Sequence, residues 1–255
     1  MGYDFCYNRS CLRMMAGAYY LPKTALGEDA HFICDEQQTI GVADGVGGWS
    51  RYGIDSGVYA RKLMDNAVES IQQQPKGKVN PGKVLADAFF NNEAEGGSTA
   101  CIITLKNNAL HAVNLGDSGF LLIRDGEIVY RSPIQQRYFN CPFQLSNSKN
   151  GDAPDSARRI VVGVEPGDIL VAATDGLFDN IFPDDIADVM NLLSLEEELP
   201  PELAARKLAE SARQQSLSKQ IVSPFTEAAV MAGLDSDVYR GGKFDDVTVI
   251  VAYIY

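Results

Sequence analysis

The sequence lacks several features that mark common classes of protein. It has only 2 histidines among 255 residues, and its 5 cysteines include no Cys-x-x-Cys pair. Structural zinc sites depend on clustered cysteine and histidine, so this arrangement argues against one. No apolar run approaches the roughly 20 residues that a membrane-spanning helix needs. The first residues show neither the apolar core of a secretory signal nor an Arg- and Ser-rich transit sequence.

Basic residues are also scarce relative to acidic ones. Lys and Arg number 22 against 34 Asp and Glu, which gives a formal net charge of -12. Nucleic acids and anionic membranes recruit clustered positive charge, so we expect neither a nucleic-acid partner nor membrane insertion. The acidic excess instead suits a site that gathers carboxylates around divalent cations. The cysteines are odd in number and irregularly spaced, and we expect them to be reduced thiols, with Cys34 and Cys101 in the core.

The remaining composition, 45% hydrophobic and 22% charged, is that of an ordinary globular protein. Apolar residues at helical spacing predict helices over 55–74, from Asn80-Pro81 onward, and over 183–193, 201–216 and 223–232. An edge strand is expected within 1–23, and a strand pair over 32–34 and 39–43. Residues 99–130 are expected to form an antiparallel meander, followed by an irregular segment over 132–158. Further strands are expected over 160–173 and 247–255.

Residues 39–49 (Thr-Ile-Gly-Val-Ala-Asp-Gly-Val-Gly-Gly-Trp) stand out because a short apolar strand runs directly into a carboxylate and several glycines. A carboxylate at the end of a buried strand is costly unless a cation neutralises it. The glycines leave room for a ligand and let a carbonyl group turn inward. Asp44 is therefore a candidate metal ligand, with the Gly45 carbonyl beside it. For this stretch taken alone, an ordinary Asp-Gly turn is the alternative.

Two further strands meet acids in the same way. Asp175 follows the apolar run 169–173, and Asp179 comes one helical turn later on the same face, where the two charges repel unless a cation lies between them. Asp245 follows a pair of glycines and leads into the last strand. Several carboxylates in close quarters stay ionised only around cations. Oxygen ligands without His or Cys select Mg²⁺ or Mn²⁺ over Zn²⁺.

Other acids are less distinctive by themselves. Asp117 lies at a strand junction among small residues. Glu28 and Asp29 stand at one end of the expected strand pair, where one of its registers would bring them near Asp44, although the sequence does not fix that register. By contrast, Asp125-Gly126 has a strand on each side and is best explained as a hairpin turn.

Six short motifs, in this order and spread over nearly the whole chain, resemble those of the metal-dependent protein phosphatases of the PPM type (protein phosphatase 2C). They are residues 27–30 (Gly-Glu-Asp-Ala), 42–45 (Val-Ala-Asp-Gly), 97–100 (Gly-Ser-Thr-Ala), 114–118 (Asn-Leu-Gly-Asp-Ser), 174–179 (Thr-Asp-Gly-Leu-Phe-Asp) and 242–249 (Gly-Lys-Phe-Asp-Asp-Val-Thr-Val). The glycine-rich segment 43–49, with 138–140 and 142–145, most resembles the organellar branch that includes the T-cell-activation phosphatase homologue and its plant relatives.

The resemblance implies an α+β fold, a four-layer α-β-β-α sandwich of two antiparallel β-sheets flanked by helices, with residues 1–255 as a single catalytic domain. It also implies two Mn²⁺ or Mg²⁺ ions at one end of the sandwich and a weaker third ion. Matched motif by motif, Asp44 would bridge both ions, Asp175 and Asp245 would complete the first, the Gly45 carbonyl would complete the second, and Glu28 would act through bound water. Asp117 and Asp179 match the acids that hold the third ion, Asp29 would support the ligands from behind, and Asp246 occupies a position that is often Asn.

The activity that the resemblance implies is hydrolysis of phosphoserine or phosphothreonine in proteins. In the mechanism that the resemblance implies, a hydroxide activated by the two metals would attack phosphorus in one in-line displacement, without a phosphoenzyme. Phosphoprotein substrates are then the expected partners. The branch resemblance implies a mitochondrial or chloroplast location, with the cytoplasm as the alternative.

Two departures from the family pattern bear on catalysis. Val46 stands where many members have a His proposed as general acid, and Thr24 stands where they have an Arg that grips the phosphate. General acid catalysis typically contributes ~10²–10⁴-fold, so we expect a slower enzyme or one that protonates the leaving group through water. Lys23, next to Thr24, is the candidate phosphate contact.

Two other functions compete with this one. The segment 116–119 (Gly-Asp-Ser-Gly) echoes the nucleophile motif of chymotrypsin-like proteases, with His31 earlier in the chain, but the expected helices before Ser118 do not suit a β-barrel. The non-enzyme alternative is a catalytically weak pseudophosphatase that binds phosphoproteins as a scaffold, which the missing His and Arg would explain.

Overall fold

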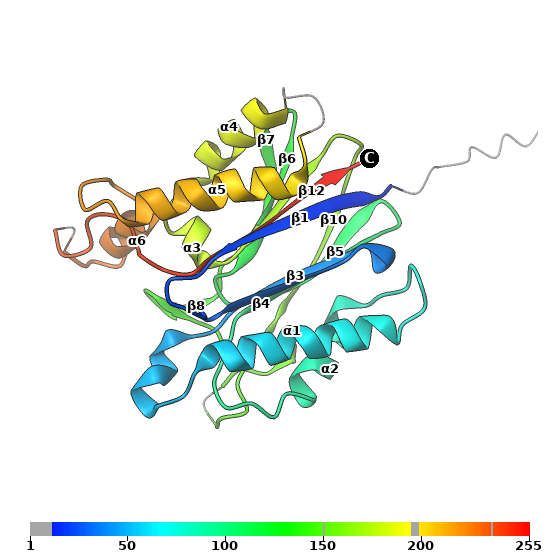
Figure 1. The fold of residues 1–255 in the computed structure, drawn as a ribbon, viewed down its shortest axis with the longest axis horizontal. Helices are drawn as coiled ribbons and strands as arrows, with labels where there is room; N and C mark the ends of the chain where they lie inside the picture. The colour runs from blue at the N-terminus through cyan, green and yellow to red at the C-terminus, as the bar shows by residue number, and fades with distance from the viewer. Residues whose placement is uncertain (1–11, 150, 195–198, 236) are drawn as a thin grey trace, which may run out of the picture.

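The computed structural model describes residues 12–149, 151–194, 199–235 and 237–255 (Figure 1). Over these residues, two five-stranded antiparallel sheets pack face to face. The first sheet has the order β1 (Met14–Leu21), β12 (Val247–Ile254), β11 (Ile169–Ala173), β6 (Gly119–Arg124), β7 (Glu127–Arg131). The second has the order β10 (Arg158–Gly163), β5 (Ala109–Leu115), β4 (Ala100–Lys106), β3 (Thr39–Asp44), β2 (Asp29–Cys34).

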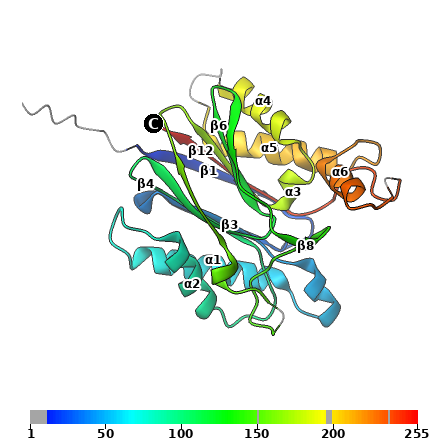
Figure 2. The ribbon, with the colours of Figure 1, turned by 180° about the vertical axis from the view of Figure 1, so that it is seen from behind.

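Helices cover the outer face of each sheet, which confirms the expected four-layer sandwich. Helices α4 (Pro183–Ser194) and α5 (Pro201–Ser216) lie on the first sheet, and α1 (Ser56–Gln72) and α2 (Pro81–Phe90) lie on the second (Figure 1). The short helix α3 (Asp175–Phe178) and α6 (Pro224–Met231) lie at one end. Figure 2 places the small hairpin of β8 (Gln136–Tyr138) and β9 (Cys141–Pro142) at that same end.

The helix starts follow from capping side chains. Asp55 precedes α1, and its carboxylate accepts a hydrogen bond from the backbone N–H of Gly57 (2.9 Å). Asn80 precedes α2, accepts from Gly82 and Lys83, and is followed by a proline at the first helical position. Such caps satisfy N–H groups that have no partner inside the helix. Both helices therefore begin where the sequence predicted.

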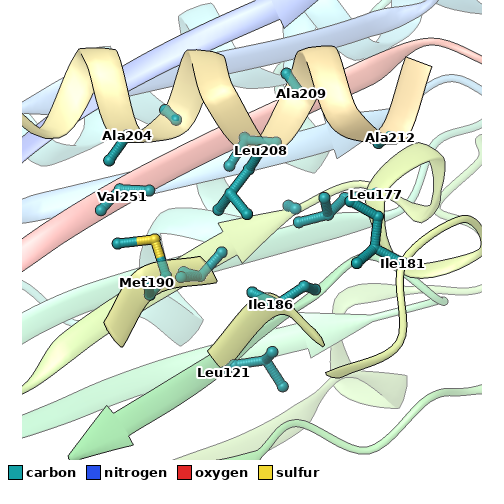
Figure 3. Packing of buried hydrophobic residues seen from close by; sticks show 14 of the residues in the cluster. Leu121, Leu177, Ile181, Ile186, Met190, Ala204, Leu208, Ala209, Ala212 and Val251 are labelled. Atoms are coloured by element: carbon teal, nitrogen blue, oxygen red, sulfur yellow. The ribbon is translucent and has the colours of Figure 1, made fainter. Parts of the chain in front are cut away.

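Central strands are apolar on both faces because helices cover one face of each sheet and the other sheet covers the opposite face. Along β12, Val249 and Val251 pack toward the helices, whereas Ile250 and Ala252 pack between the sheets. Figure 3 shows Leu208 pointing from α5 into the cluster that the first sheet shares with α4. The sequences of these strands are therefore continuous apolar runs, without the alternation of apolar and polar residues found in strands that have one face in water.

One strand arrangement differs from the sequence prediction. Residues 99–130 do not form a single meander, because β4 and β5 pair in the second sheet whereas β6 and β7 pair in the first. The crossing from one sheet to the other occurs at residues 116–118, where Gly116 has a positive φ of 100°. Glycine adopts this backbone conformation without the steric penalty of a side chain. The crossing leaves Asp117 between the sheets, at their common end.

Several smaller expectations are also resolved. The expected N-terminal edge strand is confirmed as β1, whereas Cys6 and Cys11 lie outside the described residues. Cys101 is buried as expected, but Cys34 is only half-buried because β2 is an edge strand. The segment 132–158 contains the β8–β9 hairpin and is therefore not wholly irregular. Among the described residues, none of the helices combines the length and the apolar character needed to cross a membrane.

Candidate active site

The sheet topology brings distant acids to one end of the sandwich. Asp44 ends β3, Asp175 follows β11 at the start of α3, and Asp245 precedes β12. Because β11 and β12 are antiparallel neighbours, the end of one and the start of the other lie at the same edge. In the second sheet, Asp29 and Asp44 are directly paired in the β2–β3 register, which the sequence had left open.

Three carboxylates converge most closely. Asp44, Asp117 and Asp175 each offer an oxygen atom, and these atoms all lie within 4.8 Å of one another. One oxygen of Asp117 and one of Asp175 are buried and accept no hydrogen bond within the described residues. Burial raises the pKa of Asp175 well above its usual range, and it raises the pKa of Asp117 to about 6. Loss of hydration, and then the charge of Asp175, raise the pKa of Asp44 as well.

Two lysines lie among the remaining acids. Lys243 Nζ contacts Asp175, Asp179 at 2.9 Å and Asp245 at 3.3 Å. Lys23 Nζ lies 2.8 Å from the other oxygen of Asp245. Burial opposes ionisation of Asp245, but the charges of Lys243 and Lys23 outweigh it and lower the pKa of this carboxyl. The cation that Asp175 and Asp179 were expected to require is therefore supplied, in part, by the chain itself.

Asp29 joins the two sheets behind this cluster. Its Oδ2 accepts hydrogen bonds from the hydroxyl groups of Thr174 (2.8 Å), which directly precedes α3, and Thr248 (2.7 Å), the second residue of β12. Burial raises the pKa of Asp29 to about 7, although the two threonine hydrogen bonds oppose the rise. This arrangement holds the start of β2 against the first sheet, next to Asp44.

Asp246 is buried and ties the loop before β2 to the start of β12. It accepts hydrogen bonds from the backbone N–H groups of Lys23 (2.7 Å) and Glu28 (2.9 Å) and from the Tyr20 hydroxyl (3.2 Å). The Glu28 side chain in turn lies 2.6 Å from Lys23 Nζ. Asp246 thus positions the loop that carries Glu28.

The backbone of Asp44 is anchored by the two residues that precede the neighbouring strand β4. Its N–H donates to Thr99 Oγ1 (3.0 Å), and its carbonyl accepts from Ser98 Oγ (2.9 Å). Gly45 donates to the carbonyl of Glu28 (3.0 Å), and a Cβ added there would come within 2.6 Å of the Ser56 carbonyl. The glycine after Asp44 is needed for this close approach of three backbone segments.

The remaining sequence candidates are placed as follows. Asp125 lies in an exposed turn between β6 and β7, as expected for a hairpin. Ser118 is buried and shares a hydrogen bond with Thr99 Oγ1 (2.7 Å), whereas His31 points outward from β2. Within the described residues, the Ser–His hydrogen bond that a serine hydrolase requires is absent.

Sequence reasoning missed some residues of the site. It assigned no role to Lys243, to Gln136, whose amide donates to Asp117 Oδ2 (2.9 Å), or to the two threonines that hold Asp29. The sequence does contain a signal for Lys243, because a lysine two residues before Asp245 is well placed to neutralise nearby acids. No sequence signal points to Gln136, since the position of its side chain depends on the β8–β9 hairpin.

A groove of 710 Å³ opens beside the carboxylates. It is lined by Lys23, Thr24, Ala25, Leu26, Gly27, Glu28, Gly47, Ser50, Gly53, Ile54 and Asp55. Lys23 and Glu28 belong both to this groove and to the acid cluster. A substrate lying in the groove would therefore have direct access to the carboxylates.

Comparisons with known proteins identify the family. Probable protein phosphatase 2C 55 of Arabidopsis thaliana is 47% identical over 247 residues, which cover 95% of this chain and 52% of that protein. Protein phosphatase PTC7 homolog fig of Drosophila grimshawi is 38% identical over 245 residues, covering 89% of this chain and 79% of that protein. The chain belongs to the protein phosphatase 2C (PPM) family. No family model matches the chain.

A solved structure supports this membership of the PPM family. The X-ray structure of the photosystem II phosphatase PBCP superposes with a TM-score of 0.86 and 30% sequence identity, over 94% of this chain and 98% of that one. The PTC7 homologues agree with the branch that the sequence motifs indicated. The chain spans about half the length of the plant relatives, 52% and 59% in two of them.

Proposed function

We propose that this PPM domain is a metal-dependent protein serine/threonine phosphatase, which hydrolyses phosphoserine and phosphothreonine in proteins. The observation that carries the proposal is the convergence of Asp44, Asp117 and Asp175 within 4.8 Å at the end of a sandwich shared with the family. A buried acid cluster of this kind is unfavourable without cations. It lies beside a groove of 710 Å³ that Lys23 and Glu28 help to line.

The residues fit a divalent metal centre. The donors are carboxylate oxygens, two of which are buried without a hydrogen-bond partner in the described residues, and hard cations such as Mg²⁺ and Mn²⁺ prefer oxygen ligands. We infer that Asp44, Asp175 and Asp245, with the Gly45 carbonyl and Glu28, would hold two ions. Asp117 and Asp179 would hold a weaker third. When bound, the metals would activate water and neutralise the charge of the phosphoryl group.

The protein's own side chains would then position the reactants. Asp29 and Asp246 keep the ligand-bearing strand ends together through the hydrogen bonds described above. Lys23 stands at the junction of the groove and the acids, 24% exposed, where its ammonium group can meet a phosphoryl oxygen. Val46 offers no proton, so water would protonate the leaving alkoxide, and turnover would be slower than with a histidine there.

The proposal is tested by hydrolysis of p-nitrophenyl phosphate and of a phosphothreonine peptide with Mn²⁺, with Mg²⁺ and with EDTA. We expect turnover that requires metal and returns when EDTA is replaced by Mn²⁺. Tight metal binding without turnover would instead support the phosphoprotein-binding scaffold. Turnover that EDTA leaves unchanged would exclude a metal-dependent mechanism.

Metal binding is expected to weaken in acid. Burial raises the pKa of Asp117 to about 6 and raises the pKa values of Asp44 and Asp175 well above their usual range, so these ligand carboxyl groups take up protons as the pH falls from 8 to 6. A protonated carboxyl does not ligate a cation, and metal binding must release its proton. Calorimetry should therefore give a Mn²⁺ dissociation constant about tenfold or more higher at pH 6 than at pH 8. A constant that does not change with pH would mean that these acids are ionised without metal.

Lys23 is expected to contribute to substrate affinity. In the variant Lys23→Ala we expect KM for a phosphothreonine peptide to rise about tenfold, because a charge-assisted hydrogen bond to phosphate is lost. Steady-state kinetics at saturating Mn²⁺ would measure this, with Lys62→Ala on the exposed face of α1 as the control. An unchanged KM would remove Lys23 from the substrate site.

Partners and location complete the proposal. Phosphoproteins are the proposed partners, and the net charge of -12 disfavours nucleic acids. A mitochondrial or chloroplast location rests on the branch resemblance. Imaging of the full-length protein fused to a fluorescent reporter would test it, and a cytoplasmic signal would contradict it.

A further inference from the structure

Lys243 is held in place more firmly than a surface lysine. Its backbone N–H donates to Asn180 Oδ1 (2.9 Å), and its carbonyl accepts from Asn180 Nδ2 (2.9 Å). Asn180 is itself buried and also donates to the carbonyl of Gly176 in α3 (2.9 Å). The loop before β12 is thus locked to α3, and the Lys243 side chain is directed toward the acids that α3 carries.

The ammonium group of Lys243 is surrounded by acids. It contacts the carboxylates of Asp175, Asp179 and Asp245, and the side chain is only 16% exposed. The Phe225 ring lies on another side, with its centroid 5.6 Å from Nζ, at a distance where an aromatic face attracts a cation. Within the described residues, Asp175 has no other cation within ion-pair distance.

The same three carboxylates are those that the proposed function assigns to metal. A divalent ion and an ammonium group cannot both sit between them, because two cations at such short range repel strongly in a partly buried site. We propose that Lys243 is a tethered counter-ion, and that metal loading is a cation exchange in which its ammonium group leaves the three carboxylates. This inference rests on the proposed function.

The exchange has two consequences. Without metal, Lys243 keeps the strand ends and α3 together, because it compensates carboxylates that would otherwise repel one another. When metal binds, the ion pairs of Lys243 with the three carboxylates must be broken. The metal affinity is therefore lower than that of the same carboxylates without a lysine between them. Lys243 therefore sets the metal concentration at which the site becomes loaded.

The experiment compares Lys243→Met with the native chain. Methionine keeps a flexible apolar stem of similar length but carries no charge. Lys243→Arg retains the charge, and Lys62→Met on the exposed face of α1 is the matched control. The readouts are the melting temperature in EDTA and the Mn²⁺ dissociation constant from calorimetry, neither of which depends on turnover.

We expect Lys243→Met to melt several degrees lower in EDTA and to bind Mn²⁺ about tenfold more tightly, since one partly buried ion-pair network no longer has to be broken. Lys243→Arg should melt close to the native chain in EDTA, and Lys62→Met should change neither readout. Equal or weaker Mn²⁺ binding by Lys243→Met would overturn the inference while leaving the proposed function in place. A native chain that binds no Mn²⁺ would instead overturn the proposed function, and this inference with it.

A second measurement uses only the native chain, so it tests the inference even if Lys243→Met does not fold. The native chain is treated with an amine-acetylating reagent in EDTA and in Mn²⁺, and labelling of individual lysines is read by mass spectrometry. Displacement from the carboxylates exposes the Lys243 amine, so its labelling should rise several-fold with Mn²⁺ relative to Lys62. Labelling of Lys243 that stays constant or falls would overturn the inference.

Discussion

Replacing Asp44 by asparagine is expected to lower kcat/KM for a phosphothreonine peptide by at least about 10³-fold, the scale of losing a central electrostatic group of an active site. Asp44 offers an oxygen that lies within 4.8 Å of those of Asp117 and Asp175, and its backbone is anchored by Ser98 and Thr99. Asparagine preserves the shape and these backbone bonds but removes the charge. The fold should therefore persist while metal binding and turnover are lost.

The matched control is Asp125→Asn. Asp125 also precedes a glycine, but it lies in an exposed hairpin turn with a positive φ of 50°, a conformation that asparagine tolerates well. Peptide hydrolysis at saturating Mn²⁺ and circular dichroism would be measured for both variants. If Asp44→Asn retained more than a small fraction of native turnover, Asp44 would not be a metal ligand.

Replacing Gly176 by alanine is expected to destabilise the protein by about 3 kcal/mol, because the added methyl group has no space. A Cβ at Gly176 would come within 1.8 Å of the Asp246 carbonyl oxygen and 3.1 Å of the Val247 Cα. Both are backbone atoms of the segment that leads into β12, so they cannot move aside as a side chain would. For a chain of this size we expect a melting temperature roughly 6–12 °C lower.

The same crowding is expected to affect the site. Gly176 lies where α3 crosses the start of β12, so separating them would also separate Asp175 from Asp245. The control is Gly163→Ala at the end of β10, where a Cβ would meet no atom within 4 Å. Thermal unfolding in EDTA and in Mn²⁺ would be compared. Equal stability of Gly176→Ala and Gly163→Ala would contradict the close contact.

Much of this protein could be predicted from local sequence signals. Asp55 and Asn80 mark helix starts because capping depends on residues close in the chain, and α1 and α2 begin where they indicate. Strands that end or begin beside acids and glycines identified Asp44, Asp175 and Asp245 as candidates before any geometry was known. The order of the six motifs predicted the family and the four-layer fold, which the comparisons and the structure confirm.

The pairing of the strands could not be predicted in the same way. A hairpin and a crossing between two sheets both consist of two apolar runs joined by a short glycine-containing turn. The β5–β6 connection was therefore mistaken for a continuation of the meander. Only the packing of the two sheets and their helices, which buries both faces of β4 and β6, decides that the chain crosses at Gly116.

By itself, the sequence determined the residue types of the site and the ends of the elements that carry them, since both depend on neighbours in the chain. The tertiary structure decided which groups meet. Lys243 among three carboxylates, Gln136 on Asp117 and the threonine pair on Asp29 all join segments that are far apart in sequence. Such contacts depend on the distance between side chains in the folded state, which no local pattern of residues records.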